Sequence, residues 1–254
     1  MIVGAQCYTI RAYVQTPEQI EQSFQKLQAI GYRAIQVSAF GPIEPAQLRA
    51  LADTHGLSIS VTHTDPDRIL HDTDAVIAEH KILGCKHIGI GCMPERYRGS
   101  IDGIRAFIRD FTPAMRKIHD AGCKLHYHNH AFEYERDGDT LLFDLLAEET
   151  DPALLGFILD VYWVQFAGRT PKQQIERLRG RIDVCHFKDM SMAGNEQRMA
   201  PVMEGNLDFE GILTACEKAG VSYAMVEQDD TYGKDPFDEL AKSHCNLKRA
   251  GMQF

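Results

Sequence analysis

Short apolar, β-branched runs alternate with amphipathic stretches along this sequence of 254 residues. The apolar runs predict strands at 2–8, 34–39, 57–62, 86–91, 123–130, 154–160, 182–187 and 222–227. The stretches between them predict helices near 17–30, 45–55, 67–83, 100–121, 141–148, 171–179, 209–219 and 236–251. Alternating strands and helices form a parallel sheet covered by helices, and eight such units close a (β/α)8 barrel. Because no Pro- or Ser-rich linker interrupts the series, we expect residues 1–254 to form one (β/α)8 TIM barrel domain.

The composition argues against several classes of function. The formal net charge is −9 and no basic patch is visible, so nucleic acid is not an expected partner. No apolar run approaches the roughly 20 residues that span a bilayer, and no signal peptide is apparent. The seven cysteines contain no C-x-x-C pair and are typical of core residues in a cytoplasmic protein. We expect a small molecule as the partner. No apolar stripe marks an interface, so the sequence leaves open whether the protein forms a homo-oligomer.

Four acidic or imidazole side chains lie where predicted strands end. Asp160, His186 and Glu227 end the sixth, seventh and eighth strands, and Glu133 follows the fifth. Because the carboxyl ends of all strands in a parallel barrel open onto one face, these residues should become neighbours. Converging carboxylates repel one another unless a cation compensates them. Three carboxylates and one imidazole form an oxygen-rich set that suits Mn²⁺ or Mg²⁺ and also accommodates Co²⁺ or Zn²⁺.

Each strand-end residue also has an ordinary structural interpretation. An aspartate in this position often caps the next helix, but Asp160 is followed by VYWV, which does not predict an immediate helix. Glu227 precedes the run QDD and would otherwise belong to a solvated acidic loop. His186 would otherwise be a hydrogen-bonded core histidine. Their convergence at one face of the barrel favours metal binding for all three residues.

The fifth strand leaves its metal ligand open. His126, His128 and His130 alternate and share one face, and at strand spacing only the outermost reaches a single ion. A loop after the strand could turn Glu133 back toward the ion, so we expect Glu133 to be the ligand, with His128 or His130 as the alternative. The remaining imidazoles would bind substrate hydroxyls or orient a metal ligand.

Three further residues are candidate substrate contacts at the same face. His63 ends the third strand and could bind a substrate oxygen, and Lys188, two residues past His186, could stabilise an oxyanion or lie on the surface. Trp163 is the only tryptophan and offers a flat face for a sugar ring, with core filling as its alternative. The longest stretch without a predicted element, Met190–Asn206, follows the seventh strand and predicts either a lid over the site or a mobile surface loop.

The motifs that carry these residues resemble a known family. YHNHAFEY, LDVYWVQFAG, HFKDM and the closing VEQD are similar to the sugar phosphate isomerase/epimerase group of the xylose-isomerase-like barrel superfamily, and the similarity runs nearly end to end. The resemblance implies that Glu133, Asp160, His186 and Glu227 bind one divalent metal ion, commonly Mn²⁺. Many members carry a glutamate on strand five where this chain has His128. The resemblance also implies a sugar or cyclitol as the substrate.

We therefore expect a divalent-metal-dependent sugar isomerase or epimerase that abstracts a proton next to a carbonyl, with an enediolate stabilised by the metal. Glu133 and Glu227 would remove and return the proton. A dehydratase or lyase that acts on inososes or 3-keto sugars would use the same site, and a non-catalytic sugar-binding barrel is a further alternative. An endonuclease-like barrel would need more metal ligands and a basic groove, which the net charge of −9 disfavours.

Overall fold

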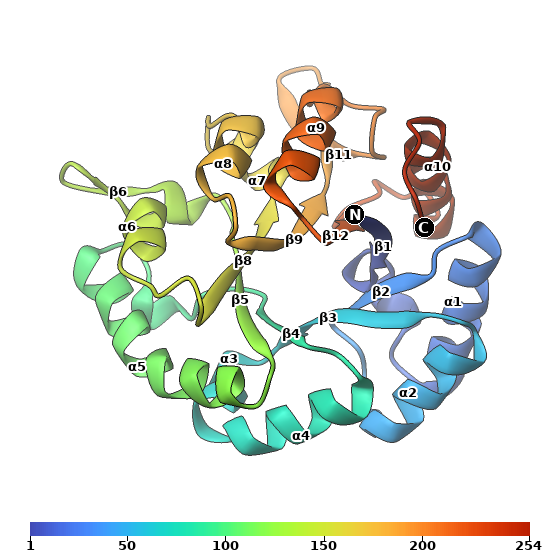
Figure 1. Cartoon of the computed structure of the whole chain (residues 1–254). Coiled ribbons are helices and arrows are strands. Elements are labelled where there is room, and N and C mark those ends of the chain that lie inside the picture. The colour runs from blue at the N-terminus through green and yellow to red at the C-terminus, as the bar shows by residue number, and fades with distance from the viewer.

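The structure, a computed structural model, describes residues 1–254 and contains eight parallel strands closed into a barrel. The strands are β1 (Ile2–Gln6), β2 (Ala34–Val37), β3 (Ser58–Thr64), β4 (His87–Ile90), β5 (Lys124–His128), β8 (Leu155–Asp160), β9 (Ile182–Phe187) and β12 (Tyr223–Val226). Each pairs with its neighbours in the order β1-β12-β9-β8-β5-β4-β3-β2, and β1 closes the ring against β2. Figure 1 shows the strands at the centre of the molecule with the helices around them. The predicted (β/α)8 barrel is confirmed.

The helices cover the outside of the barrel. They are α1 (Pro17–Ile30), α2 (Pro45–Thr54), α3 (Pro66–His71), α4 (Thr73–Leu83), α5 (Ile101–Asp120), α6 (Leu142–Glu148), α7 (Val161–Phe166), α8 (Pro171–Arg177), α9 (Phe209–Ala219) and α10 (Pro236–Arg249). Short 3-10 turns occur at η1 (Cys7–Tyr13), η2 (Glu95–Tyr97) and η3 (Phe132–Tyr134). The start of α1 illustrates the local signals, because Thr16 Oγ1 accepts a hydrogen bond from Gln19 N and Pro17 takes the first helical position. None of these helices combines the length and the apolar character needed to cross a membrane.

Three segments differ from the sequence-based prediction. The helix predicted at 67–83 is divided into α3 and α4, which meet at Asp72. Helix α7 begins directly after Asp160, where no immediate helix was expected. The segment Met190–Asn206 is not irregular, since it contains most of an antiparallel hairpin of β10 (Asp189–Ala193) and β11 (Glu196–Ala200). A second short pair, β6 (Arg136–Asp137) and β7 (Thr140–Leu141), precedes α6.

The barrel interior is layered. The main hydrophobic core lies between the strands and the helices. Inside the barrel, a small group of apolar side chains forms what we call the inner apolar layer: Ala34, Val61, Ile158, Val184 and Met225. Successive residues of a strand point alternately inward and outward, so residues two positions away from this layer also face the interior. The layer thus separates polar side chains at the carboxyl ends of the strands from polar side chains at the amino ends.

Candidate metal centre

Four buried side chains converge at the carboxyl ends of neighbouring strands, and we call them the mouth cluster: His128, Asp160, His186 and Glu227. They lie within the last two residues of β5, β8 and β9 or directly follow β12, and these strands are consecutive in the barrel. One potential ligand atom from each lies within 4.8 Å of those of the others. The structure therefore brings together three of the four residues that we expected as ligands, and it adds His128.

Glu133 does not belong to the mouth cluster. Its Oε1 accepts a hydrogen bond of 2.5 Å from the Tyr127 hydroxyl, and its Oε2 accepts one of 2.8 Å from His130 N. Tyr127 alternates with His128 on β5 and points out of the barrel, where its ring packs against Phe107. Glu133 is thus held on the outer side of β5, and the chain does not return its carboxylate to the interior. Burial raises the pKa of Glu133 to about 7, although the hydrogen bond from Tyr127 acts in the opposite direction.

Both imidazoles of the mouth cluster are oriented by a hydrogen bond on their far side. His128 Nδ1–H donates to the carbonyl oxygen of Gly91 at 2.9 Å, which leaves Nε2 without a proton, 3.4 Å from Asp160 Oδ2. With a neutral ring, His186 donates Nε2–H to Gln36 Oε1 at 2.8 Å and keeps Nδ1 bare, 3.1 Å from Glu227 Oε2. Burial would lower the pKa of His186, but Glu227 and Asp160 raise it above its usual value, so a metal ion at Nδ1 would replace a proton. Nδ1 of His186 makes no hydrogen bond. A bare imidazole nitrogen and a carboxylate repel each other unless a cation lies between them. In metal-binding histidines, one ring nitrogen usually donates a hydrogen bond to the protein and the other, unprotonated nitrogen binds the ion.

Asp160 divides its two oxygens between two roles. Oδ1 caps α7 by accepting hydrogen bonds from Tyr162 N at 2.9 Å and Trp163 N at 3.2 Å. Oδ2 faces the mouth cluster. Asn129, which lies between the two histidines of the YHNH motif, accepts a hydrogen bond from Asp160 N at 2.9 Å and so fixes the backbone. Helix capping and metal binding were alternatives in the sequence, but the structure shows that capping leaves the second oxygen free to serve the cluster.

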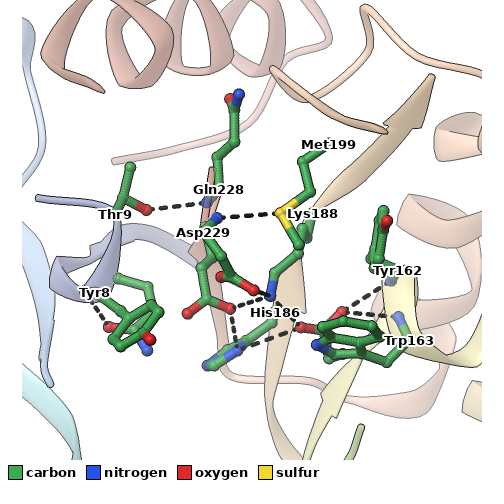
Figure 2. A network of polar contacts seen from close by, with 12 residues as sticks. Tyr8, Thr9, Tyr162, Trp163, His186, Lys188, Met199, Gln228 and Asp229 are labelled. Carbon is green, nitrogen blue, oxygen red and sulfur yellow. Dashed lines mark hydrogen bonds and ion pairs between the residues drawn. The ribbon is translucent and has the colours of Figure 1, made fainter. Parts of the chain in front are cut away.

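Lys188 supplies a buried positive charge beside the mouth cluster. Its Nζ lies 3.0 Å from Asp160 Oδ2, 2.8 Å from Glu227 Oε2 and 2.9 Å from Asp229 Oδ1. Figure 2 shows this side chain reaching toward Asp229 with His186 beside it. Burial alone would lower the pKa of Lys188, but the three carboxylates outweigh burial and raise it well above its usual value. Lys188 is therefore a cation at neutral pH and not a surface lysine.

Asp229 is a site residue that the sequence assigned only to an acidic loop. Burial raises the pKa of Asp229 to about 6, with a further contribution from the charge of Glu227. Its backbone N–H donates to Met199 Sδ of β11 at 3.2 Å, so the hairpin lies directly beside the site (Figure 2). Asp189 anchors the other end of this hairpin segment, because its carboxylate accepts hydrogen bonds from four backbone N–H groups. A lid role for the segment stays a prediction.

A polar cavity of about 360 Å³ opens above the mouth cluster. Its lining residues are Tyr8, Ser38, His63, Thr64, Asp65, Pro66, Gly91, Cys92, His128, His130, Lys188, Glu227 and Asp229. Sequence reasoning missed Ser38, Thr64 and Asp65, which follow or end β2 and β3 and were detectable by the same strand-end argument that selected the others.

Four of the five predicted substrate contacts line this cavity, and Trp163 lies behind His130 without lining it. His63 and His130 line it, and each has one buried ring nitrogen without a partner, Nε2 of His63 and Nδ1 of His130. Burial and neighbouring imidazoles lower the pKa of His63 well below its usual value and that of His130 to about 3, so both are neutral. Trp163 packs against His130 with a centroid separation of 5.5 Å, and Lys188 Nζ lies 5.4 Å from the centre of its ring.

Comparison with known proteins agrees with this architecture. A family model described as the xylose isomerase-like TIM barrel matches residues 24–248. The rhizopine catabolism protein MocC of Rhizobium meliloti is 25% identical over 237 residues, which cover 82% of this chain and 69% of MocC. A solved sugar phosphate isomerase/epimerase from Parabacteroides distasonis has a TM-score of 0.82 at 22% identity, and the alignment covers 98% of this chain and 93% of that one.

A probable 3-DHS dehydratase, AsbF of Bacillus anthracis, has a TM-score of 0.73 at 14% identity, with 98% of this chain and 99% of AsbF covered. Identities this low show a common fold and leave the reaction to be argued from the site. The family match covers most of the chain and agrees with the motifs in its sequence. The chain belongs to the xylose isomerase-like TIM barrel family.

Proposed function

We propose that this protein is a divalent-metal-dependent isomerase or epimerase that moves a proton on the carbon next to the carbonyl of a small sugar or cyclitol. The observation that carries the proposal is the mouth cluster, where two oriented imidazole nitrogens and two carboxylates converge at the floor of a polar cavity. The similarity to a sugar phosphate isomerase/epimerase supports this class of reaction.

The donor set fits a metal ion of borderline or hard character. His128 Nε2, Asp160 Oδ2, His186 Nδ1 and the Glu227 carboxylate would hold it. Such an ion, which we propose is Mn²⁺, would supply Lewis-acid polarisation of the substrate carbonyl. Glu133, expected from the sequence as ligand and base, has no part in this proposal because its oxygens are engaged on the outer side of β5.

Glu227 is the residue that we propose as the general base. It lines the cavity, so a substrate carbon can approach its carboxylate. Burial would raise the pKa of Glu227, but the fixed positive charge of Lys188 lowers it, and the group is ionised at neutral pH as a base must be. His63 and His130, neutral and with free ring nitrogens, would hydrogen-bond substrate hydroxyls.

We propose that Lys188 stabilises the negative charge that develops on the substrate oxygen. Its ammonium group lies at the cavity wall, between the mouth cluster and Asp229. A fixed cation beside a developing oxyanion typically accelerates a reaction by about 10²–10³-fold. The flat face of Trp163 packs near Lys188 and would complete the wall on which a sugar ring lies.

Dehydration is a second candidate reaction, and the pair of Lys188 and Asp229 favours it specifically. Loss of a β-hydroxyl requires an acid that protonates the leaving oxygen. Asp229 lies 2.9 Å from Lys188 and has its pKa raised to about 6 by burial first and by Glu227 second, so this pair offers a proton at the cavity wall. The fold likeness to a probable 3-DHS dehydratase is consistent with this alternative.

Deuterium exchange tests the proposal. Mn²⁺-loaded protein is incubated in D₂O with a panel of ketoses, inososes and 3-keto sugars, and carbon-bound deuterium is measured by mass spectrometry. Exchange without water loss supports isomerisation or epimerisation, whereas an unsaturated product supports dehydration. Glu227→Gln should lower the exchange rate by about 10²-fold or more, while Glu133→Gln should stay within a few-fold of the natural chain. Tight binding without exchange across the panel would contradict the proposal and favour a sugar-binding barrel.

A further inference from the structure

A second group of metal-ligating side chains lies at the opposite end of the barrel, and we call it the amino-end cluster: His87, His126 and Asp183. His87 begins β4, Asp183 is the second residue of β9, and His126 lies in the middle of β5, one inward position before His128. One potential ligand atom from each lies within 4.8 Å of the other two. The inner apolar layer separates this cluster from the mouth cluster, so neither the proposed reaction nor its metal involves these residues.

The contacts of His126 hold its ring with one nitrogen beside the carboxylate of Asp183. Its Nδ1 lies 3.1 Å from the carbonyl oxygen of Lys124, and its Nε2 lies 2.9 Å from Asp183 Oδ2, where the ring donates a hydrogen bond to the carboxylate. Gly156 keeps the space beside this nitrogen open, since a Cβ at that position would lie 2.9 Å from Nε2. A metal ion between His126 and Asp183 would take the place of the proton on Nε2, and Nδ1–H would orient the ring by donating to the carbonyl oxygen of Lys124.

His87 contributes a second imidazole, and one of its ring nitrogens has no hydrogen-bond partner. Its Nδ1 is buried and has no partner, and its ring centre lies 4.9 Å from that of His126. Asp183 is 32% exposed through its side chain, so the cluster is open to solvent at the amino-terminal mouth of the barrel. An ion can therefore enter from that side and keep a water ligand.

Lys124 is the group that competes for this position. Its Nζ lies 2.9 Å from the same Asp183 Oδ2 that His126 faces. Lys124 compensates the carboxylate, but it leaves the buried Nδ1 of His87 without a partner. A divalent ion would satisfy all three groups and would displace the ammonium group toward solvent.

We propose that His87, His126 and Asp183 form a second metal site that binds Zn²⁺ or a similar transition-metal ion. Two imidazoles and one carboxylate with an open fourth position are typical protein ligands for Zn²⁺, and such a set suits borderline transition metals better than Mg²⁺. The ion would link β4, β5 and β9 at the end of the barrel remote from the chemistry. Its function would be to stabilise the barrel.

Metal counting with Co²⁺ as the spectroscopic probe tests the proposal. The natural chain should bind two ions, one at each cluster, and His87→Gln or Asp183→Asn should bind one. The double variant Asp160→Asn/His186→Gln, which disables the mouth cluster, should keep one ion with the visible absorption of Co²⁺ bound to nitrogen and oxygen. Zn²⁺ should raise the melting temperature of this double variant, and adding His87→Gln should abolish the increase.

Lys124→Met should tighten metal binding, a gain that misfolding of the variant would not produce. Removal of the competing ammonium group should tighten Co²⁺ binding at the amino-end cluster by about tenfold, because a charge-assisted hydrogen bond no longer has to be broken. The proposal is overturned if the mouth-disabled variant binds no Co²⁺ and the addition of Lys124→Met to it creates no binding. That result would leave Lys124, Asp183 and His126 as an ion-pair network, and it would not affect the mouth cluster or the proposed reaction.

Discussion

Replacement of Glu133 by glutamine should change how stability depends on pH while leaving the metal centre in place. Burial raises the pKa of Glu133 from 4.5 to about 7 in the folded protein. The folded state therefore holds this proton more tightly than the unfolded chain does. Stability from this group is fully present below about pH 4.5 and is lost as the pH rises toward 7. One pKa unit corresponds to about 1.4 kcal/mol, so a shift of this size costs the natural chain about 3 kcal/mol above pH 7.

The glutamine variant removes this titration at a fixed local cost. Its amide oxygen still accepts the hydrogen bond from Tyr127, but its NH₂ group faces the donor His130 N, which costs about 1–3 kcal/mol at every pH. Relative to the natural chain, the variant should therefore gain about 3 kcal/mol between pH 4.5 and pH 8. Urea unfolding of both proteins at intervals across this range measures the difference. Glu135→Gln, at an exposed neighbouring position, is the control and should show no such gain.

Two results would refute this reasoning about Glu133. Parallel stability curves for the natural chain and Glu133→Gln would show that the carboxylate does not titrate within the interior. A tenfold or greater loss of Mn²⁺ affinity in Glu133→Gln would show that the residue serves the metal after all. Retained affinity together with the altered pH dependence supports the placement of Glu133 on the outer side of β5.

Three further predictions concern the mouth cluster. Asp160→Asn and Asp160→Ala should both lose Mn²⁺ affinity by about 10²-fold or more. The alanine variant should also be about 1 kcal/mol less stable in urea unfolding, because only asparagine keeps the cap of α7. Gln36→Leu, which removes the acceptor for His186 Nε2–H, should weaken Mn²⁺ binding by about 10–100-fold in a metal titration. Lys188→Met should retain or tighten Mn²⁺ binding, since the competing cation is gone, yet lower deuterium exchange by about 10²-fold; unchanged exchange would exclude Lys188 from the reaction.

The order of strands and helices could be predicted because each element carries its own periodicity and its own start and stop residues. Three residues of the mouth cluster followed from topology alone, since strand ends in a closed parallel barrel must meet. Which way a residue beyond the strand end turns is decided by long-range contacts, and so the position of Glu133 could not be derived. The hydroxyl of Tyr127, on the outer face of β5, holds it there.

Two other differences had local signals. The sequence Gly194-Asn195 is a two-residue turn of the kind that joins hairpin strands, and it connects β10 to β11 where an irregular stretch was expected. The run VYWV is richer in strand-forming than in helix-forming residues, so the sequence does not predict that Asp160 caps a helix there. Tertiary packing overrides that preference, since Val161, Tyr162 and Val164 are all buried.

The measurement that bears most directly on the metal centre is pulsed electron paramagnetic resonance of bound Mn²⁺, which counts coordinated imidazole nitrogens. The mouth cluster predicts two such nitrogens in the natural chain, from His128 and His186, and the same two in Glu133→Gln. His128→Gln should retain one. A single nitrogen in the natural chain, or a count that His128→Gln leaves unchanged, would contradict the assignment of His128 as the ligand from β5.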